Sequence, residues 1–189
     1  MMQIQHAAAA ARQVKPRQKQ SGLDQLLAGK YSIRPYSELT RPYQLALAHY
    51  MAVDGEAWDN FLVLPSTRNT QEVICRALNL ALPQYVKQYG QVKFGIAKLT
   101  SRAVIKSVAA TPEIAEDFED WKAYHKWYCS QGGAVDHPRR NRWPVILSNT
   151  DDETLRDGWH RLHCYVSQGA RNLPAVFYPH PHHLRSVVG

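Results

Sequence analysis

The chain has 189 residues, a length that favours one domain with a sizeable buried core. Its hydrophobic content of 44% is ordinary for a globular protein. No apolar run is long enough to cross a membrane, and residues 4–11 are too short and too mildly apolar for a secretory signal. These features exclude an integral membrane protein and a secreted one. We expect a cytoplasmic chain in a bacterium, at most peripheral to the inner face of the inner membrane.

The net charge of +7 and the isoelectric point near 9.4 favour an anionic partner. Nucleic acid, a nucleotide and an acidic membrane face all fit, although many basic proteins bind no nucleic acid. The three cysteines are widely spaced, so no disulfide framework follows and a reducing compartment fits best. Neither a Walker phosphate-binding loop nor a G-x-S-x-G nucleophile elbow is present.

Residues 1–30 carry five cations against Asp24, and Pro16, Ser21 and Gly22 interrupt any helix. This pattern predicts a flexible basic arm that follows a phosphate backbone, or else a solubilising tail. A helix is expected from about Pro42 to residue 53, and a short strand over residues 60–64. A further amphipathic helix is expected from Thr70, with Pro83 as its end or a kink.

Residues 91–108 contain two β-prone runs, VKFGIAKL and AVIKSV. Lys93, Lys98 and Arg102 place positive charge along these runs and the connection between them. The pattern predicts either a basic ribbon that lies against DNA or an ordinary solvated sheet face.

A helix is predicted from Thr111 because Pro112 suits the first helical position and acids follow. One interpretation is that these acidic residues complement the helix dipole. The alternative is that Glu116 and Asp120 share a divalent metal ion. The loop over residues 131–141 leads into a strand, and three guanidinium groups lie where the two meet. These groups either bind phosphate, which their planar donors suit, or are simply exposed. They belong to Arg139, Arg140 and Arg142.

The segment from residue 142 to 178 reads as strand, turn, strand, helix and strand. Asp157 is the expected N-cap of the helix and Gly169 its stop. His160 and Arg161 stand in the first helical turn, where a cation costs about 0.3–1 kcal/mol. That placement is favourable if an anion binds there, because a Gly-bearing loop before a helix is a phosphate-binding geometry. The alternative is a solvent-facing Arg161 whose charge is screened.

This segment resembles the core of the ParB/sulfiredoxin superfamily, in which a Gly-x-His-Arg loop opens a helix that cradles nucleotide phosphates. Residues 158–161 match that loop, Pro144 matches the opening of the preceding strand, and residues 169–176 match the exit strand. Trp159 replaces the nucleophilic cysteine of sulfiredoxin, which excludes sulfinic acid reduction. Partition proteins carry a helix-turn-helix domain after this core, and because only a short tail follows the exit strand here, we do not expect a partition protein. In length and basic character, the chain resembles plasmid fertility inhibition factors of the oncogenic-suppression type.

The Pro/His-rich composition of residues 179–189 predicts an irregular tail. The resemblance implies an α+β fold, with a mixed sheet and flanking helices, over residues 31–178. It implies that the backbone of Gly158 and Trp159, together with Arg161 and Arg140 or Arg142, binds nucleotide phosphates. His160 would then act as general acid or donate a hydrogen bond to the phosphoryl oxygen. Asp157 would cap the helix, hold a metal ion or orient a water. This site requires an Arg161 that is open to solvent and not neutralised by a carboxylate of the protein.

By the same resemblance, ATP is a substrate or ligand, with Mg²⁺ as its possible ion, and DNA and a type IV secretion coupling protein are partners. The implied function is ATP hydrolysis and DNA cleavage that block conjugative DNA transfer. The alternative is an inhibitor without catalysis that docks on the coupling protein or on DNA. A second metal hypothesis combines His160 and His163 with Cys164 or the tail histidines, His180, His182 and His183. Side chains of the adjacent His163 and Cys164 diverge, so they cannot both contact one ion.

Overall fold

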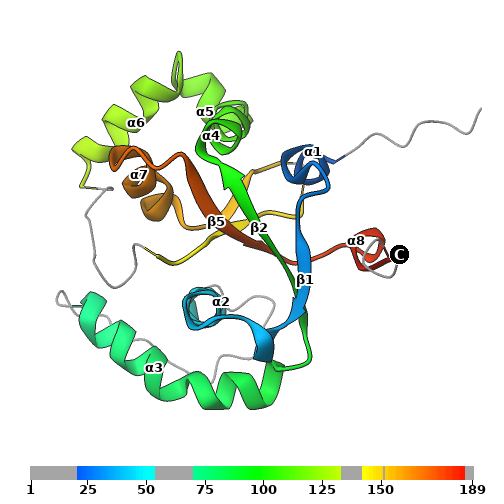
Figure 1. The fold of residues 1–189 in the computed structure, drawn as a ribbon. Helices are drawn as coiled ribbons and strands as arrows, with labels where there is room; N and C mark the ends of the chain where they lie inside the picture. The colour runs from blue at the N-terminus through cyan, green and yellow to red at the C-terminus, as the bar shows by residue number, and fades with distance from the viewer. Residues whose placement is uncertain (1–20, 54–69, 133–141, 151, 186–189) are drawn as a thin grey trace, which may run out of the picture.

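The computed structural model describes residues 21–53, 70–132, 142–150 and 152–185. It shows an α+β fold with a five-stranded mixed sheet in the order β1-β2-β5-β3-β4 (Figure 1). Strands β3 and β5 are parallel, and the other neighbours are antiparallel. The expected fold class, a mixed sheet with flanking helices in a single domain, is confirmed. The strands are β1 (Ser32–Pro35), β2 (Lys93–Thr100), β3 (Val145–Leu147), β4 (Leu155–Asp157) and β5 (Asn172–Phe177).

Helices cover both faces of this sheet. In Figure 1, α2 and α3 lie below the sheet, whereas α4, α5, α6 and α7 lie above it. Within the described part of the chain, no helix combines the length and the apolar character needed to cross a bilayer. The helices are α1 (Gly22–Leu27), η1 (Tyr36–Glu38), α2 (Arg41–Val53), α3 (Thr70–Tyr89), α4 (Ser101–Ala109), α5 (Pro112–Asp117), α6 (Trp121–Ser130), α7 (Trp159–Ser167) and α8 (Pro181–Arg185).

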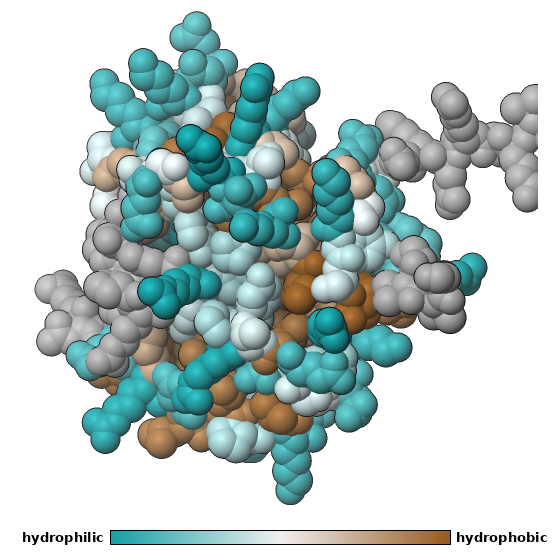
Figure 2. Space-filling model, in the orientation of Figure 1, coloured by the Kyte–Doolittle hydropathy of each residue, from teal (hydrophilic) through white to brown (hydrophobic). Residues whose placement is uncertain are grey.

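Strand alternation divides the core into two clusters, one on each face of the sheet. On β2, Phe94 belongs to the cluster under α2 and α3, whereas Ala97 and Leu99 belong to the cluster under α1, α4, α6 and α7. Strand β5 divides in the same way, with Val176 on the first face and Phe177 on the second. Figure 2 shows apolar surface gathered over the α2–α3 layer and a mostly polar surface over α4 to α6.

The second β-prone run of the 91–108 segment is helical, so that strand prediction is wrong. Thr100 ends β2 and caps α4 by accepting a hydrogen bond from the Ala103 N–H. Val104 and Val108 are four residues apart and both fully buried, as they would be on one face of a helix. Tertiary packing therefore overrides the preference of these β-branched residues for strands.

Pro83 lies inside α3 rather than at its end, because the helix continues to Tyr89. The helix expected from residue 111 is two helices, since Phe118 is extended and ends α5. Asp120 then caps α6 and accepts a hydrogen bond from the Ala123 N–H at 2.8 Å. The carboxylate proposed to share a metal ion with Glu116 is thus an N-cap on the next helix, which contradicts that reading.

Both expected terminal segments contain folded elements. Within the expected arm, Ser21 caps α1, and Leu23 and Leu27 of that helix are buried in the core. Within the expected irregular tail, residues 181–185 form α8, which buries His183. The expected strand at 60–64 and the loop at 133–141 lie outside the described residues, as do residues 1–20.

Candidate functional site

The predicted turn between strand and helix is present, with its cap shifted by one residue. Strand β4 ends at Asp157, and Gly158 is the N-cap of α7 with φ of +100°. A positive φ of this size favours glycine. Asp157 is therefore not the N-cap, and its Oδ1 instead accepts a hydrogen bond from the Gly158 N–H at 2.6 Å. The helix runs to Ser167, and Gly169 follows with φ of +68°, as the predicted stop requires.

Arg161 is buried in this turn and is not open to a ligand. It is 6% exposed, and its Nη2 donates to Asp157 Oδ2 at 3.0 Å. Burial alone would raise the pKa of Asp157, but Arg161 and the nearby His49 outweigh burial and lower it. The carboxylate is therefore ionised and neutralises the guanidinium. A phosphate ligand at this turn would need an Arg161 that is open to solvent and not neutralised by a carboxylate. The structure therefore contradicts Arg161 as a phosphate ligand.

The guanidinium also fills the space over Gly158, which is itself buried. A Cβ at residue 158 would stand 2.9 Å from Arg161 Nη2 and 3.0 Å from the Val145 Cα. The Gly158 N–H, which was predicted to bind phosphate, instead donates to Asp157. Arg161 Nε is buried and has no hydrogen-bond partner among the described residues.

The other predicted residues are dispersed. His160 is exposed and its ring lies 5.5 Å from that of Tyr128, whereas Trp159 is half-buried against the core. Arg142 is exposed, and Arg139 and Arg140 lie outside the described residues. Of the predicted site residues that the structure describes, Asp157, Gly158 and Arg161 come together.

The predicted basic ribbon does not form. Lys93 and Lys98 are both on β2 and exposed, but they are five residues apart. Because alternate residues of a strand point to opposite faces, these two side chains project from different sides of the sheet. Arg102 is exposed on α4, where a strand was expected.

A pocket of about 610 Å³ lies where β3 and β5 end. The parallel strands bring Ser148 and Tyr178, which follow them, to one edge of the sheet, next to the start of β2. The floor is apolar and belongs to the core under α2 and α3. It is formed by Leu47, Met51, Phe94 and Ile146. Ligands of open α/β sheets bind at the carboxyl ends of parallel strands, so the position is typical of a binding site.

The rim of this pocket is polar and aromatic. Arg156 donates from Nε to the Tyr50 hydroxyl at 2.9 Å and pairs with Glu153 at 3.2 Å. Tyr178 is about half exposed and meets Phe94 edge to face, with ring centroids 6.0 Å apart. Asn149 completes the rim. The site combines an apolar floor, two phenol rings, an amide and a cation.

A second cluster joins α6 to α7 on the other face of the sheet. The Nδ1 atoms of His125 and His163 are 2.6 Å apart, and the Cys129 sulfur lies 3.9 Å from His125 Nδ1. The two imidazole rings are parallel within 2° with centroids 4.9 Å apart, so they meet edge to edge through a hydrogen bond. Burial, followed by the neighbouring His125 and His160, lowers the pKa of His163 to about 3. Burial also lowers the pKa of His125, so both rings are neutral at neutral pH.

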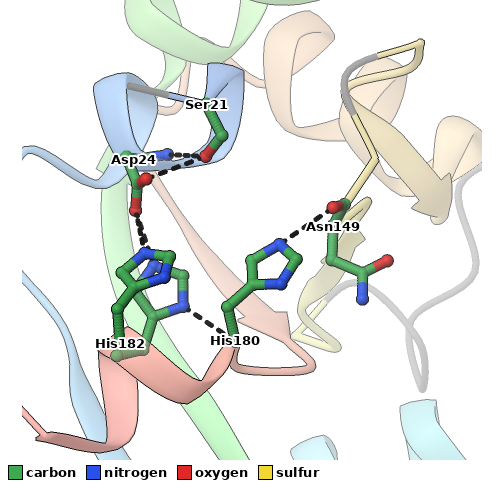
Figure 3. Close-up of polar contacts among 6 residues, drawn as sticks. Ser21, Asp24, Asn149, His180 and His182 are labelled. Carbon is green, nitrogen blue, oxygen red and sulfur yellow. Dashed lines mark hydrogen bonds and ion pairs between the residues drawn. The ribbon is translucent and has the colours of Figure 1, made fainter. Parts of the chain in front are cut away.

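A third cluster holds the two ends of the described chain together (Figure 3). The Nε2 atoms of His182 and His183, on α8, lie 2.9 Å and 2.7 Å from Asp24 Oδ1 on α1. His183 Nδ1 accepts a hydrogen bond from the His180 N–H, so the proton of neutral His183 is on Nε2 and points at the carboxylate. Each of these groups therefore has its hydrogen bond without an added ion.

The metal hypothesis for His160, His163, Cys164 and the tail histidines is wrong in its grouping. Described donors that converge form two separate groups, one of His125, Cys129 and His163 and the other of Asp24, His182 and His183. The spacing of four residues between His125 and Cys129 was a readable signal, because such residues share a helix face. The contributions of His163 and Asp24 come from other elements and had no signal in the sequence. Comparisons with protein-family models, with curated proteins and with solved structures gave no match to this chain.

Proposed function

We propose that this protein binds a nucleotide or a ligand of similar chemistry in the pocket at the ends of β3 and β5. The observation that supports the proposal is a concave site with an apolar floor and a guanidinium on its rim. Its volume of about 610 Å³ lies within the usual range for small-molecule sites, about 300–1,000 Å³. The resemblance implied a nucleotide at the Gly158 turn, but the buried pair of Asp157 and Arg161 occupies that turn.

The pocket offers groups that suit the parts of a nucleotide. An aromatic base stacks on exposed phenol rings, and Tyr178 presents one at the rim. Asn149 supplies an amide that donates and accepts, which suits the polar edge of a base. Arg156 supplies a guanidinium on the rim, and a phosphate group there would compete with Glu153 for this exposed cation. The buried floor then excludes water from the apolar face of the ligand.

The resemblance extends the proposal to the biological role. It implies that ATP and DNA are hydrolysed and that conjugative transfer through a type IV secretion system is blocked at the bacterial inner membrane. The resemblance makes His160, which is exposed on α7, the candidate general acid. The alternative is docking on the coupling protein or on DNA without catalysis, with the nucleotide as a structural ligand. The net charge of +7 supports an anionic partner in both cases.

Calorimetric titration of the full chain with ATP tests the site. We expect Arg156→Gln to weaken ATP binding by about 10-fold to 100-fold, the loss expected for a charge-assisted hydrogen bond. Tyr178→Ala should weaken adenosine and ATP alike, whereas Arg156→Gln should spare adenosine. Arg142→Gln is the matched control, since Arg142 is exposed and does not line the pocket. Equal ATP affinity of the wild type and both pocket variants would contradict nucleotide binding in this pocket.

Catalysis is tested by incubating the protein with ATP and with plasmid DNA, with and without Mg²⁺. Loss of both activities in His160→Ala, with unchanged ATP binding, would support hydrolysis with His160 as general acid. Intact substrates with the wild type would leave the docking alternative. DNA binding should weaken steeply as salt rises if phosphate contacts dominate, and a flat salt dependence would contradict them.

A further inference from the structure

The geometry points to a transition-metal site formed by His125 and Cys129 of α6 and His163 of α7, with Zn²⁺ as the ion that fits best. This site does not depend on the proposed nucleotide pocket. The pocket floor belongs to the core under α2 and α3, whereas Trp121, Tyr124 and Tyr128 around the three donors pack into the opposite core. The two sites therefore lie on different faces of the sheet.

The three donor atoms already converge. His125 and Cys129 are four residues apart on α6 and so project from one helix face. His163 meets them from α7, with the two Nδ1 atoms 2.6 Å apart and the sulfur 3.9 Å from His125 Nδ1. Tetrahedral zinc with bonds of about 2.0–2.1 Å to nitrogen keeps two such atoms about 3.3 Å apart. An opening of the two rings by roughly 0.7 Å would admit the ion.

The donor set selects the class of metal. Two imidazole nitrogens and one thiolate suit borderline and soft ions such as Zn²⁺, whereas Mg²⁺ and Ca²⁺ require oxygen. On binding, the Cys129 thiol releases its proton to solvent and the sulfur bonds to the metal. Three protein ligands leave a fourth position for water or another donor, as in open zinc sites. The Ser167 hydroxyl lies 3.4 Å from His125 Nε2, the ring nitrogen that does not face the ion, and it can orient that imidazole.

Aromatic rings hold the central ligand in place. His163 is fully buried and lies parallel to Tyr128 at 3.9 Å and to Trp121 at 5.0 Å between centroids. Its Nε2 has no hydrogen-bond partner among the described residues. This nitrogen does not face His125, so in the neutral ring it can keep the proton and leave Nδ1 to bind a metal. In the Asp24 group, by contrast, the hydrogen bonds are already complete. A fixed ring with its Nδ1 aimed at two further donors is pre-organised for an ion.

Titration of the reduced, chelator-treated protein with Co²⁺ tests the inference by absorption. A bound thiolate gives an intense near-ultraviolet charge-transfer band, so we expect that band to saturate at one equivalent and to vanish when Zn²⁺ is added. Cys129→Ser should abolish the band, and His125→Ala should weaken Co²⁺ binding by about tenfold or more. The Asp24 group has no sulfur, so it cannot produce this band.

Two controls keep the result specific. Cys75→Ser removes a thiol of the opposite core, and Cys164→Ser removes the thiol next to His163, and both should keep the band. Circular dichroism confirms that each variant is folded. Absence of the band in the wild type, its persistence in Cys129→Ser, or its loss only in Cys164→Ser would each overturn the inference.

Discussion

Arg161 donates from Nη2 to the Asp157 carboxylate across 3.0 Å, at the junction of β4 and α7. The pair satisfies two charges within the first turn of the helix and covers Gly158. A cation near a helix N-terminus is unfavourable by itself, but the adjacent carboxylate reverses that balance. The motif that resembles a phosphate-binding loop thus stabilises the connection between β4 and α7 in this protein.

Removal of the guanidinium should destabilise the fold. Arg161→Met removes the guanidinium partner of the Asp157 carboxylate, whose side chain is 28% exposed, so we expect a loss of about 3 kcal/mol, the lower end for a buried pair. Urea unfolding followed by circular dichroism measures it. Arg156→Met is the matched control, because its pair with Glu153 is exposed and should be worth about 1 kcal/mol or less. Equal losses in the two variants would contradict a structural role for Arg161.

The pair also predicts a dependence of stability on acid. Burial opposes ionisation of Asp157, but Arg161 and His49 lower its pKa below the ordinary 3.8. The contribution is therefore complete above that value and is lost as the pH falls through the lower, folded pKa. We expect the stability difference between wild type and Asp157→Asn to shrink between about pH 6 and about pH 3. A difference that stays constant or grows in acid would show that the pKa is not lowered.

Gly158 should tolerate no side chain. Its φ of +100° strains any other residue, and a Cβ would meet Arg161 and the Val145 backbone at 3.0 Å or less. We expect Gly158→Ala to lower the free energy of unfolding by about 1–3 kcal/mol. Gly169→Ala is the control, since φ there is +68° and nothing lies within 4 Å of the added Cβ. If both variants lose the same stability, backbone strain alone accounts for the glycine.

The contact between α1 and α8 should depend on Asp24. Asp24→Ala removes the acceptor shared by His182 and His183, and we expect faster amide hydrogen exchange over residues 180–185. His183→Ala should have a similar effect because the ring is buried against Tyr31 and Phe177. His182→Ala should change exchange little, since that side chain is 56% exposed. Unchanged exchange in Asp24→Ala would show that apolar packing alone holds α8.

Much of the fold could be predicted from the sequence because the patterns that indicate its helices and strands are local. The alternation of Phe94 and Ile96 predicted β2, and Thr111 with Pro112 predicted a helix start. The run over 103–108 was misread because its β-branched residues suit a strand and also meet the helical spacing of Val104 and Val108. The core and the Thr100 cap select the helix. The folded ends of the chain were missed because α1 and α8 are short and are stabilised by distant partners.

The sequence by itself determined the fold class, the order of most elements, the basic charge and the bend at Gly158. Only the tertiary structure decided how the polar side chains are used, because each pairing depends on elements that meet in space. It neutralises Arg161 with Asp157, opens a pocket at the ends of β3 and β5, and brings His163 to within 2.6 Å of His125. The charge of a side chain follows from the amino-acid sequence, whereas its partner and its access to solvent depend on how the elements pack.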